Sequence, residues 1–322
     1  MKDGYRDVMG VLLLRKDPGM SSNAALQKAR RLYRAAKAGH TGTLDPFAEG
    51  LLPVCFGEAT KFAQRCLDAD KEYVATSRVG LSTDTLDLDG RPVAQSEATV
   101  DEGRLRAAVA GFVGEIWQTP PMASALKRDG KPLYKYLREG VEVERAPRRV
   151  MIRSLDLLSV EPTEVRARVA CSKGTYIRVL MSDLLKSAGC ESRLTRLVRS
   201  RLGDLRVENA LGLDELARMG EDRLMGVLLQ PDVLLFGMPR ADFAPGSALA
   251  LINGKTAVAE EPEALARLAS KTGAGTSAGT IEFKAYRTDT GGFIGLVEPT
   301  FRASGECRPA RMMSAASAGF GP

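Results

Sequence analysis

Asp45 is the residue in this sequence best placed to do chemistry. It precedes Pro46 in the segment 39–57, GHTGTLDPFAEGLLPVCFG, and His40, the one histidine of the chain, stands five residues upstream. An aspartate before a proline commonly begins a helix, with the aspartate as N-cap and the proline at the first helical position. Three features favour a functional carboxylate instead: the proline holds Asp45 extended, the glycines let a substrate approach the backbone closely, and the histidine is near in sequence. The carboxylate could then serve as nucleophile, base or metal ligand, and the local pattern leaves these alternatives open.

The rest of the residue inventory narrows the chemistry. A single histidine excludes metal sites of the H-E-x-x-H kind. The five cysteines have no C-x-x-C pair and no regular spacing, which is typical of reduced thiols rather than of a zinc site or a disulfide framework. We therefore expect no metal and no cofactor, and carboxylate, Lys, Arg or Tyr side chains to carry most of any catalysis.

Clusters of positive charge indicate a polyanionic partner. The chain has 46 Lys and Arg against 40 Asp and Glu, a formal charge of +6, and the basic residues gather in three places. One cluster follows Ser21, a second lies in 118–150, and a third comprises Arg193, Arg196, Arg199, Arg201 and Arg206. Solvated surface is the commoner explanation of such a run, but the first cluster has five positive charges and no acidic neighbour, which favours phosphate contact.

Hydrophobic periodicity predicts the elements that must position these residues. We expect strands at 11–14, 73–79 and 165–171, from short apolar runs or two-residue alternation. The N-cap candidates at 21–23 predict the start of a helix that extends to residue 36. Further helices are expected at 58–67, at 177–188 and at 213–219, and one more after a capping box at 99–102. The segment 39–57, with four glycines and two prolines, is expected to be mostly loop with a brief helix at 47–51.

The chain is long enough, at 322 residues, for two domains. The hydrophobic pattern restarts after about residue 230, so we expect one domain at 1–235, with a basic excursion at 118–150, and a second at 236–322. Within the second domain, 272–280 reads as a flexible loop and 312–322 should fray. No apolar run approaches the ~20 residues that cross a bilayer and no secretory signal is visible, so we expect a cytoplasmic protein.

A series of motifs resembles the TruB-type family of pseudouridine synthases, the bacterial tRNA pseudouridine-55 synthases. The motifs occur in family order over about the first 205 residues, and the match beyond 235 is thinner. They are 19–23 (GMSSN), 39–46 (GHTGTLDP), 50–53 (GLLP), 57–61 (GEATK), 71–73 (KEY), Gly80, 83–85 (TDT), 118–122 (QTPPM), 124–127 (SALK) and 171–178 (CSKGTYIR).

The resemblance implies a fold and a set of site residues. The fold is α+β, with a mixed, largely antiparallel central sheet of the pseudouridine synthase kind, followed by a small, mainly β, PUA-like RNA-binding domain. Asp45 matches the catalytic aspartate, Tyr73 the tyrosine that packs on the target base, and Arg178 the arginine that pairs with the aspartate. His40 matches the histidine associated with opening the RNA loop, and Tyr176 belongs to the motif that carries Arg178.

The implied reaction is isomerisation of a tRNA uridine, U55 of the T loop, to pseudouridine. The N1–C1′ bond breaks, the base turns, and C5 joins C1′, without cofactor or metal. Whether Asp45 attacks C1′, attacks C6 or promotes a glycal route stays open. The target base must be flipped out of its stack, which the basic clusters would support by holding phosphates of the T arm. We expect a monomer with no obligate protein partner and no membrane association.

Two alternative functions and two departures from the family pattern stand beside this interpretation. A tRNA-binding or tRNA-folding factor on the same scaffold would need no catalysis, and a carboxylate hydrolase of small substrates would show little salt dependence. The family usually has Asp-Lys-Pro after its first strand, whereas this chain has Lys16-Asp17-Pro18, so no role is assigned to Lys16. Phe47 and Glu49 stand where Leu and Thr are common, which affects fine positioning more than identity.

Overall fold

A computed structural model describes residues 4–271, 281–300 and 305–320. The expected flexible loop at 272–280 lies outside the described residues. None of the helices in the described ranges is long and apolar enough to cross a membrane.

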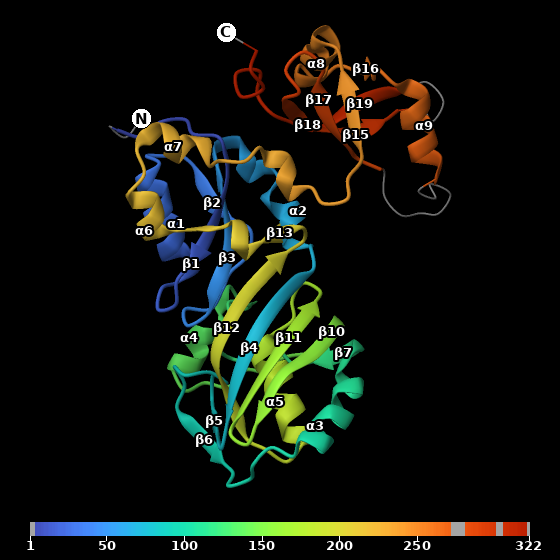
Figure 1. Cartoon of the computed structure of the whole chain (residues 1–322). Coiled ribbons are helices and arrows are strands. Elements are labelled where there is room, and N and C mark those ends of the chain that lie inside the picture. The colour runs from blue at the N-terminus through green and yellow to red at the C-terminus, as the bar shows by residue number, and fades with distance from the viewer. Residues whose placement is uncertain (1–3, 272–280, 301–304, 321–322) are drawn as a thin grey trace.

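A long twisted sheet forms the body of the molecule (Figure 1). Its strands run in the order β14-β1-β3-β12-β4-β11-β10-β7, with β2 beside β3 and β13 beside β12. Only β1–β14 and β3–β12 are parallel, so the sheet is mixed and largely antiparallel, as expected. The strands are β1 Gly10–Lys16, β2 Ala38–His40, β3 Glu49–Phe56, β4 Lys71–Val79, β7 Gly114–Gln118, β10 Arg148–Glu161, β11 Glu164–Cys171, β12 Ser192–Leu202, β13 Leu205–Arg206 and β14 Leu211–Gly212.

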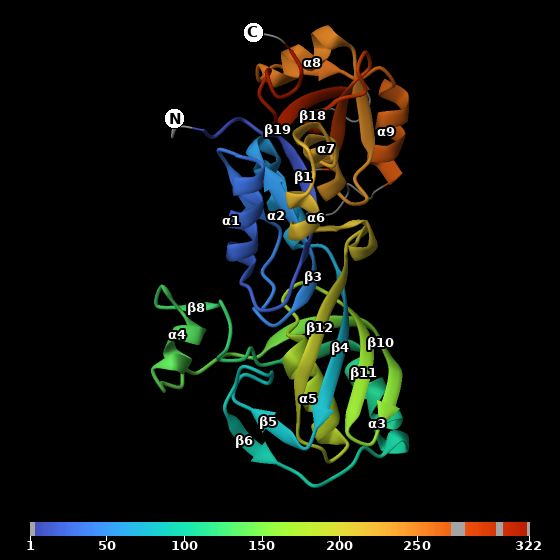
Figure 2. The ribbon, with the colours of Figure 1, turned by 60° about the vertical axis from the view of Figure 1, so that its left-hand side comes forward.

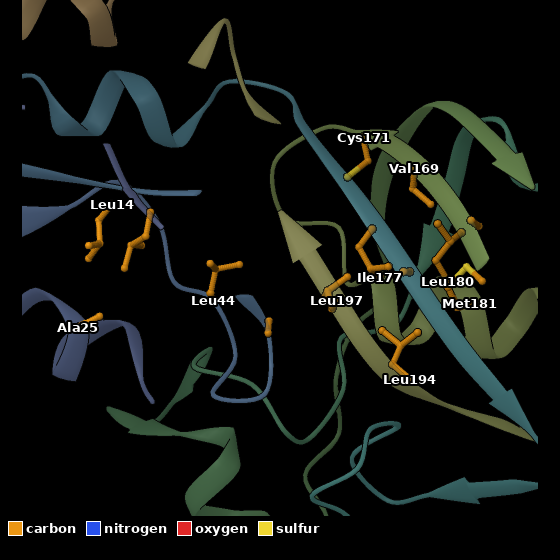
Figure 3. Packing of buried hydrophobic residues seen from close by; sticks show 14 of the residues in the cluster. Leu14, Ala25, Leu44, Val169, Cys171, Ile177, Leu180, Met181, Leu194 and Leu197 are labelled. Atoms are coloured by element: carbon orange, nitrogen blue, oxygen red, sulfur yellow. The ribbon is translucent and has the colours of Figure 1, made fainter. Parts of the chain in front are cut away.

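Most helices of this part lie on one face of the sheet and bury a common core with it, whereas the buried side of α2 packs on the opposite face of β1 and β3. The apolar stripe predicted for 177–188 is buried in α5, and Figure 3 shows Ile177, Leu180 and Met181 beside Val169 and Leu194. The same cluster continues to Leu14, Ala25 and Leu44, so one core lies behind both halves of the sheet. The helices of this part are α1 Ser22–Leu32, α2 Ala63–Leu67, α3 Glu102–Val109, α4 Leu133–Arg138, α5 Ile177–Ser187, α6 Leu213–Ala217 and α7 Glu221–Gly226. Short 3-10 turns occupy Gly57–Lys61, Ala110–Phe112, Val207–Asn209 and Pro231–Leu234.

The expectation of a loop with a brief helix in 39–57 was wrong. Residues 38–40 and 49–56 form β2 and β3, which pair with each other, and β3 also pairs with β1 and β12. All side chains from Leu51 to Phe56 are buried, because a strand inside a sheet covered on both faces is apolar without alternation. The glycines and prolines made this run look like a loop, yet Gly50 and Pro53 lie inside β3.

Two smaller details also differ from expectation. Helix α3 begins with Asp101 as its N-cap, whose side chain accepts from the Arg104 amide, rather than with a capping box from Thr99. Most of the third basic cluster lies in β12, a strand that the hydrophobic pattern did not predict. The excursion 118–150 holds the small hairpin β8 Lys127–Arg128 and β9 Lys131–Pro132 and the helix α4, which project away from the body (Figure 2). A further hairpin consists of β5 Leu81–Thr83 and β6 Pro92–Gln95.

A second sheet forms the C-terminal part of the chain, in the order β15-β17-β18-β19-β16. Its core is shared with the first part: Val11, Leu51 and Phe62 belong to the same buried cluster as Phe283 and Phe293. The rings of Phe62 and Phe293 meet edge to face with centroids 5.2 Å apart. The elements are β15 Arg240–Phe243, α8 Pro245–Ile252, β16 Ala257–Val258, α9 Pro262–Lys271, β17 Phe283–Arg287, β18 Phe293–Pro299 and β19 Glu306–Met312.

The end of the chain does not match the expected frayed segment at 312–322 within its described residues. Met313 and Ala318 are buried. The Ser314 amide donates to Glu58 at 2.6 Å, and Arg287 donates to the Ala318 carbonyl at 3.0 Å. Residues 313–320 are therefore held by buried Met313 and Ala318 and by hydrogen bonds to both parts of the molecule.

Candidate active site

Asp45 lies in the loop between β2 and β3 and borders an open cleft. It does not cap a helix: the Ala48 amide donates to the Asp45 carbonyl at 3.1 Å and closes a turn that leads into β3. Its side chain is 33% exposed, so the carboxylate faces the cleft and is not enclosed by its own chain. The cleft has a volume of about 100 Å³ and is lined by Thr43, Leu44, Asp45, Tyr73, Thr175, Tyr176, Ile177, Arg178 and Leu197.

Side chains from α1 and β1 hold the Asp45 loop on both sides. The buried Ser22 hydroxyl donates to the Leu44 carbonyl at 3.0 Å and accepts from the Leu44 amide at 2.8 Å. On the other side, Lys16 Nζ and the Gly19 amide both donate to the Pro46 carbonyl, at 3.2 and 2.9 Å. Burial lowers the pKa of Lys16 to about 8, and the three carbonyls that it contacts replace the water it has lost. Backbone bonds on either side of Asp45 thus fix the loop.

Arg178 connects the loop to α5. Its Nε donates to Asp45 Oδ2 at 2.9 Å, while Nη1 and Nη2 donate to the carbonyls of Thr85 and Ala123 at 2.5 and 2.7 Å. The side chain is 2% exposed, and its three nitrogens all have acceptors. The contact with Asp45 is therefore single, not the bidentate pair expected from guanidinium geometry, because the other two nitrogens hold backbone segments.

Asp87 is a second carboxylate beside Arg178. Its Oδ2 lies 3.5 Å from Arg178 Nη1, and its Oδ1 accepts from Thr85 Oγ1 at 2.5 Å. Burial raises the pKa of Asp87, and this outweighs the opposing effects of the Thr85 hydroxyl and Arg178. Arg178 is thus flanked by one carboxylate open to the cleft and one that is buried.

Tyr73 and Leu197 form the apolar side of the cleft, from the neighbouring strands β4 and β12. Burial raises the pKa of the Tyr73 phenol, and the positive charge of Arg199 only partly opposes this. Tyr73 is therefore a neutral phenol near pH 7, a flat apolar surface with one hydroxyl donor.

Tyr176, at the start of α5, is fixed from outside the cleft. The Gln118 amide group accepts from the Tyr176 amide at 2.7 Å and donates to its carbonyl at 3.0 Å. The guanidinium of Arg148 lies over the Tyr176 ring, 5.0 Å from its centroid. Tyr176 thus borders the cleft, and Gln118 fixes its backbone from β7.

His40 does not line the cleft, although Asp45, Tyr73, Arg178 and Tyr176 all do. Its Nδ1 accepts from the Gly42 amide at 3.3 Å. Burial, assisted by the positive charge of Arg199, lowers the pKa of His40, so the ring is neutral near pH 7 and can accept this bond.

Several site residues carried no interpretable signal in the sequence. Arg199 is 1% exposed and donates to the carbonyls of Leu51 and Gly42 at 2.7 and 3.2 Å, linking β12 to β3 and to the Asp45 loop. Ser22 looked like one of three equivalent N-caps, but Ser21 is the cap. Asp87 and Leu197 gave no local cue. Among the described residues no group of His, Cys, Asp and Glu side chains could hold a metal ion.

Comparison with known proteins places this arrangement in a family. Residues 30–177 match the profile of the TruB family pseudouridylate synthase N-terminal domain. A tRNA pseudouridine synthase B of Aromatoleum aromaticum is 52% identical over 254 residues, 79% of this chain and 82% of that protein. Another, of Ralstonia nicotianae, is 50% identical over 259 residues, with 79% and 82% covered.

Solved structures agree on the fold. A chain in the crystal structure of a Cbf5-Nop10-Gar1 complex superposes with a TM-score of 0.65 at 21% identity, covering 96% of this chain and 87% of that one. A chain of the archaeal box H/ACA sRNP Nop10-Cbf5 complex gives 0.64 at 20% identity, covering 97% and 88%. The expected pseudouridine synthase fold is thereby confirmed. About half of the aligned residues of this chain are identical to those of the two tRNA pseudouridine synthases B, and the alignments cover most of each chain. This chain therefore belongs to the TruB family of pseudouridylate synthases.

Proposed function

We propose that this enzyme isomerises a uridine of tRNA to pseudouridine, at position 55 of the T loop. The observation that carries the proposal is the Asp45 carboxylate, held by Arg178 at 2.9 Å on the wall of an open cleft whose other side is the ring of Tyr73. The two relatives that share about half of their aligned residues with this chain are tRNA pseudouridine synthases, which supports tRNA as the substrate. Position 55 and the role of Asp45 follow from the motif resemblance.

Each group has a defined part in this reaction. The N1–C1′ bond breaks and a C5–C1′ bond forms, while a proton leaves C5 and N1 becomes protonated, so the product has the same atoms as the substrate. Asp45 supplies the negative charge next to the nucleoside, and Arg178 balances that charge and orients the carboxylate. The Tyr73 ring covers the base while it turns, and its neutral phenol is a donor rather than a base.

The uridine must leave its stack before the carboxylate can reach it. Unstacking costs a few kcal/mol, which contacts to the RNA must offset. Two basic regions are suited to this: the exposed face of α1 and the projecting segment 118–150 (Figure 2). We further propose that 1–235 is the catalytic domain and that 236–322 is a PUA-like domain that binds RNA, in a monomeric cytoplasmic enzyme. His40, outside the cleft, would contact the opened RNA loop rather than the base.

Mapping of pseudouridine tests the reaction and its position together. Unmodified tRNA transcripts are incubated with the purified protein, and pseudouridine is located by chemical modification and primer extension. The proposal predicts one new pseudouridine, at U55. Product at another uridine would overturn the position, and absence of product in all transcripts would overturn the reaction.

A tRNA-binding or tRNA-folding role is the second candidate, favoured by the basic side chains on the exposed face of α1. It does not exclude catalysis. For either role tRNA affinity must fall steeply with added salt, because each neutralised phosphate releases counterions. An affinity that does not respond to salt would contradict both roles and favour a hydrolase of small substrates.

A further inference from the structure

Trp117 is an exposed aromatic residue for which the isomerase site has no use. It is the one tryptophan of the chain, and it is 65% exposed, more than any other large apolar residue in the described ranges. It lies on β7, which forms one edge of the central sheet in Figure 1. Burying a tryptophan of this size in a complex would stabilise that complex strongly, so the ring is a candidate contact for a ligand.

An arginine holds one face of this ring. Arg149 is the cross-strand neighbour of Trp117, and its guanidinium lies 5.1 Å from the ring centroid. Glu115, two residues before Trp117 on the same face of the sheet, pairs with Arg149 at 3.2 Å. The guanidinium is therefore fixed over the tryptophan, and the ring's remaining exposed surface is available for a second planar group.

This surface lies at the same edge of the sheet as residues that hold the candidate active site, on the opposite face. Gln118, the next residue after Trp117, holds the backbone of Tyr176 in the cleft by two hydrogen bonds. Arg148, the residue before Arg149, covers the Tyr176 ring at 5.0 Å. Successive residues of a strand point to opposite faces, so the edge of the sheet carries two arginine–aromatic pairs, one toward the cleft and one on its outer face.

We propose that Trp117 and Arg149 form a stacking platform for an unpaired base of the RNA substrate, outside the cleft that receives the uridine. The inference rests on the proposed function, because it takes the substrate to be RNA. RNA that enters the cleft past Tyr176 reaches Trp117 by crossing the edge of the sheet at β7. An aromatic ring backed by a guanidinium is the group on which proteins stack single-stranded bases.

The surroundings favour a base over a protein partner. Charged side chains are depleted at the core of a protein interface. Trp117 is instead flanked on its face of the sheet by the charged side chains of Glu115 and Arg149, which are 52% and 63% exposed. A single ring between charges fits one stacked base.

Tryptophan fluorescence tests the platform directly, because Trp117 is the sole tryptophan. Unmodified tRNA transcript is titrated into the wild-type protein with excitation selective for tryptophan, and free N-acetyl-tryptophanamide at the same RNA concentrations corrects for absorption. Stacking predicts a saturable loss of emission with the same midpoint as tRNA binding measured by filter retention. Unchanged emission at saturating tRNA would overturn the proposal.

Substitution gives an independent measurement. Trp117→Ala should bind tRNA about tenfold more weakly, equivalent to about 1.4 kcal/mol, within the range for loss of one stacked base. KM should rise with little change in kcat, and Trp117→Phe should restore most of the affinity. Leu158→Ala, an equally superficial change at a 39% exposed residue of β10, is the matched control and should bind as wild type. If Trp117→Ala binds tRNA with wild-type affinity, the platform is overturned. This holds also if a protein is found to bind at Trp117.

Failure of the platform and failure of the proposed function give different results. If the wild-type protein forms no pseudouridine, the proposed function fails, whereas the fluorescence and affinity measurements still report whether RNA stacks on Trp117. If pseudouridine forms but Trp117→Ala binds normally, the platform alone is wrong.

Discussion

Arg178 is the residue on which the geometry of the cleft depends most. Its three nitrogens reach three separate segments: the Asp45 side chain, the carbonyl after β5 at Thr85, and the carbonyl of Ala123 in the excursion. A planar guanidinium can make these three bonds in fixed directions, and an ammonium cannot. The positive charge and the shape of the side chain therefore contribute separately.

Replacing Arg178 by lysine tests the contribution of shape. Arg178→Lys keeps the charge but loses the planar set of donors, so kcat should fall by about a hundredfold through misplacement of Asp45. Arg178→Ala should in addition lower the free energy of unfolding by about 3–5 kcal/mol, because Asp87 is left buried without its partner. Turnover and urea denaturation measure the two effects, and a wild-type kcat in Arg178→Lys would contradict this role.

The titration of His40 can be followed without ambiguity because the chain has one histidine. Burial, together with Arg199, lowers the pKa of His40, so the proton NMR signals of its ring should titrate below pH 6.5. The unfolded chain then binds a proton that the folded chain does not, and this histidine's contribution to stability is lost as the pH falls below 6.5. A midpoint at or above 6.5 would be inconsistent with a buried ring beside Arg199.

Local pattern identified the chemistry at Asp45 only as one of several alternatives. The pattern of Asp before Pro fits a helix cap equally well, but in the structure a turn follows Asp45 and residues 49–56 pair into the sheet as β3. Three side chains from distant parts of the sequence bind the backbone of the Asp45 loop. The sequence separation between donor and acceptor is 22 for Ser22, 30 for Lys16 and 157 for Arg199. Such contacts have no local signature, so motif resemblance was needed to select Asp45, Tyr73 and Arg178.

Among the elements, β3 depends on a glycine at a close approach of two strands. Gly50 has φ +104°, and a Cβ there would lie 2.5 Å from the Arg199 carbonyl oxygen of β12. β3 and β12 are parallel neighbours at this point, and Arg199 also donates from its side chain to Leu51. A side chain at residue 50 would push apart β12, which carries Arg199, and β3, which leads out of the Asp45 loop.

Gly50→Ala should therefore lower the free energy of unfolding by at least about 2 kcal/mol, from backbone strain and steric overlap together. Gly111→Ala is the matched control, because an added Cβ there meets nothing within 4 Å and the backbone is not in the left-handed region. Chemical denaturation of both variants provides the comparison. Equal stability of Gly50→Ala and wild type would show that β3 and β12 can separate at no cost.

Periodicity predicted the elements whose pattern is strict and missed those whose pattern is not. The alternation of Val165, Ala167 and Val169 gave β11, and the stripe in α5 was placed within one residue. β3 was missed because it is buried on both sides and contains glycine and proline. β12 was missed because its arginines suggested surface, although Arg199 among them is buried.

At the scale of the whole molecule, the two sheets share a hydrophobic core. Phe62 and Phe293 meet at its centre, and polar bonds surround it, such as that from Lys61 to the Met312 carbonyl at 3.1 Å. The proposed boundary at residue 235 separates the strands of the two sheets but does not separate their cores. The two parts should therefore stabilise each other.

Thermal unfolding should accordingly show one transition for the whole chain. Phe62→Ala, which removes a fully buried ring from the shared core, should lower its Tm by about 5–10 °C without splitting it. Val258→Ala, at a 50% exposed residue of β16, is the control and should leave Tm unchanged. Two resolved transitions in the wild-type protein would contradict a shared core.

The central claim is that the charge of Asp45 drives the isomerisation. Asp45→Asn preserves the size of the side chain and removes its charge, so pseudouridine formation should be abolished while tRNA affinity stays within a few-fold of wild type. Asp156→Asn, at an exposed residue of β10, is the matched control and should turn over normally. Pseudouridine formed by purified Asp45→Asn at a rate near that of the wild type would show that the isomerisation does not require this carboxylate, and the catalytic role of Asp45 would be refuted.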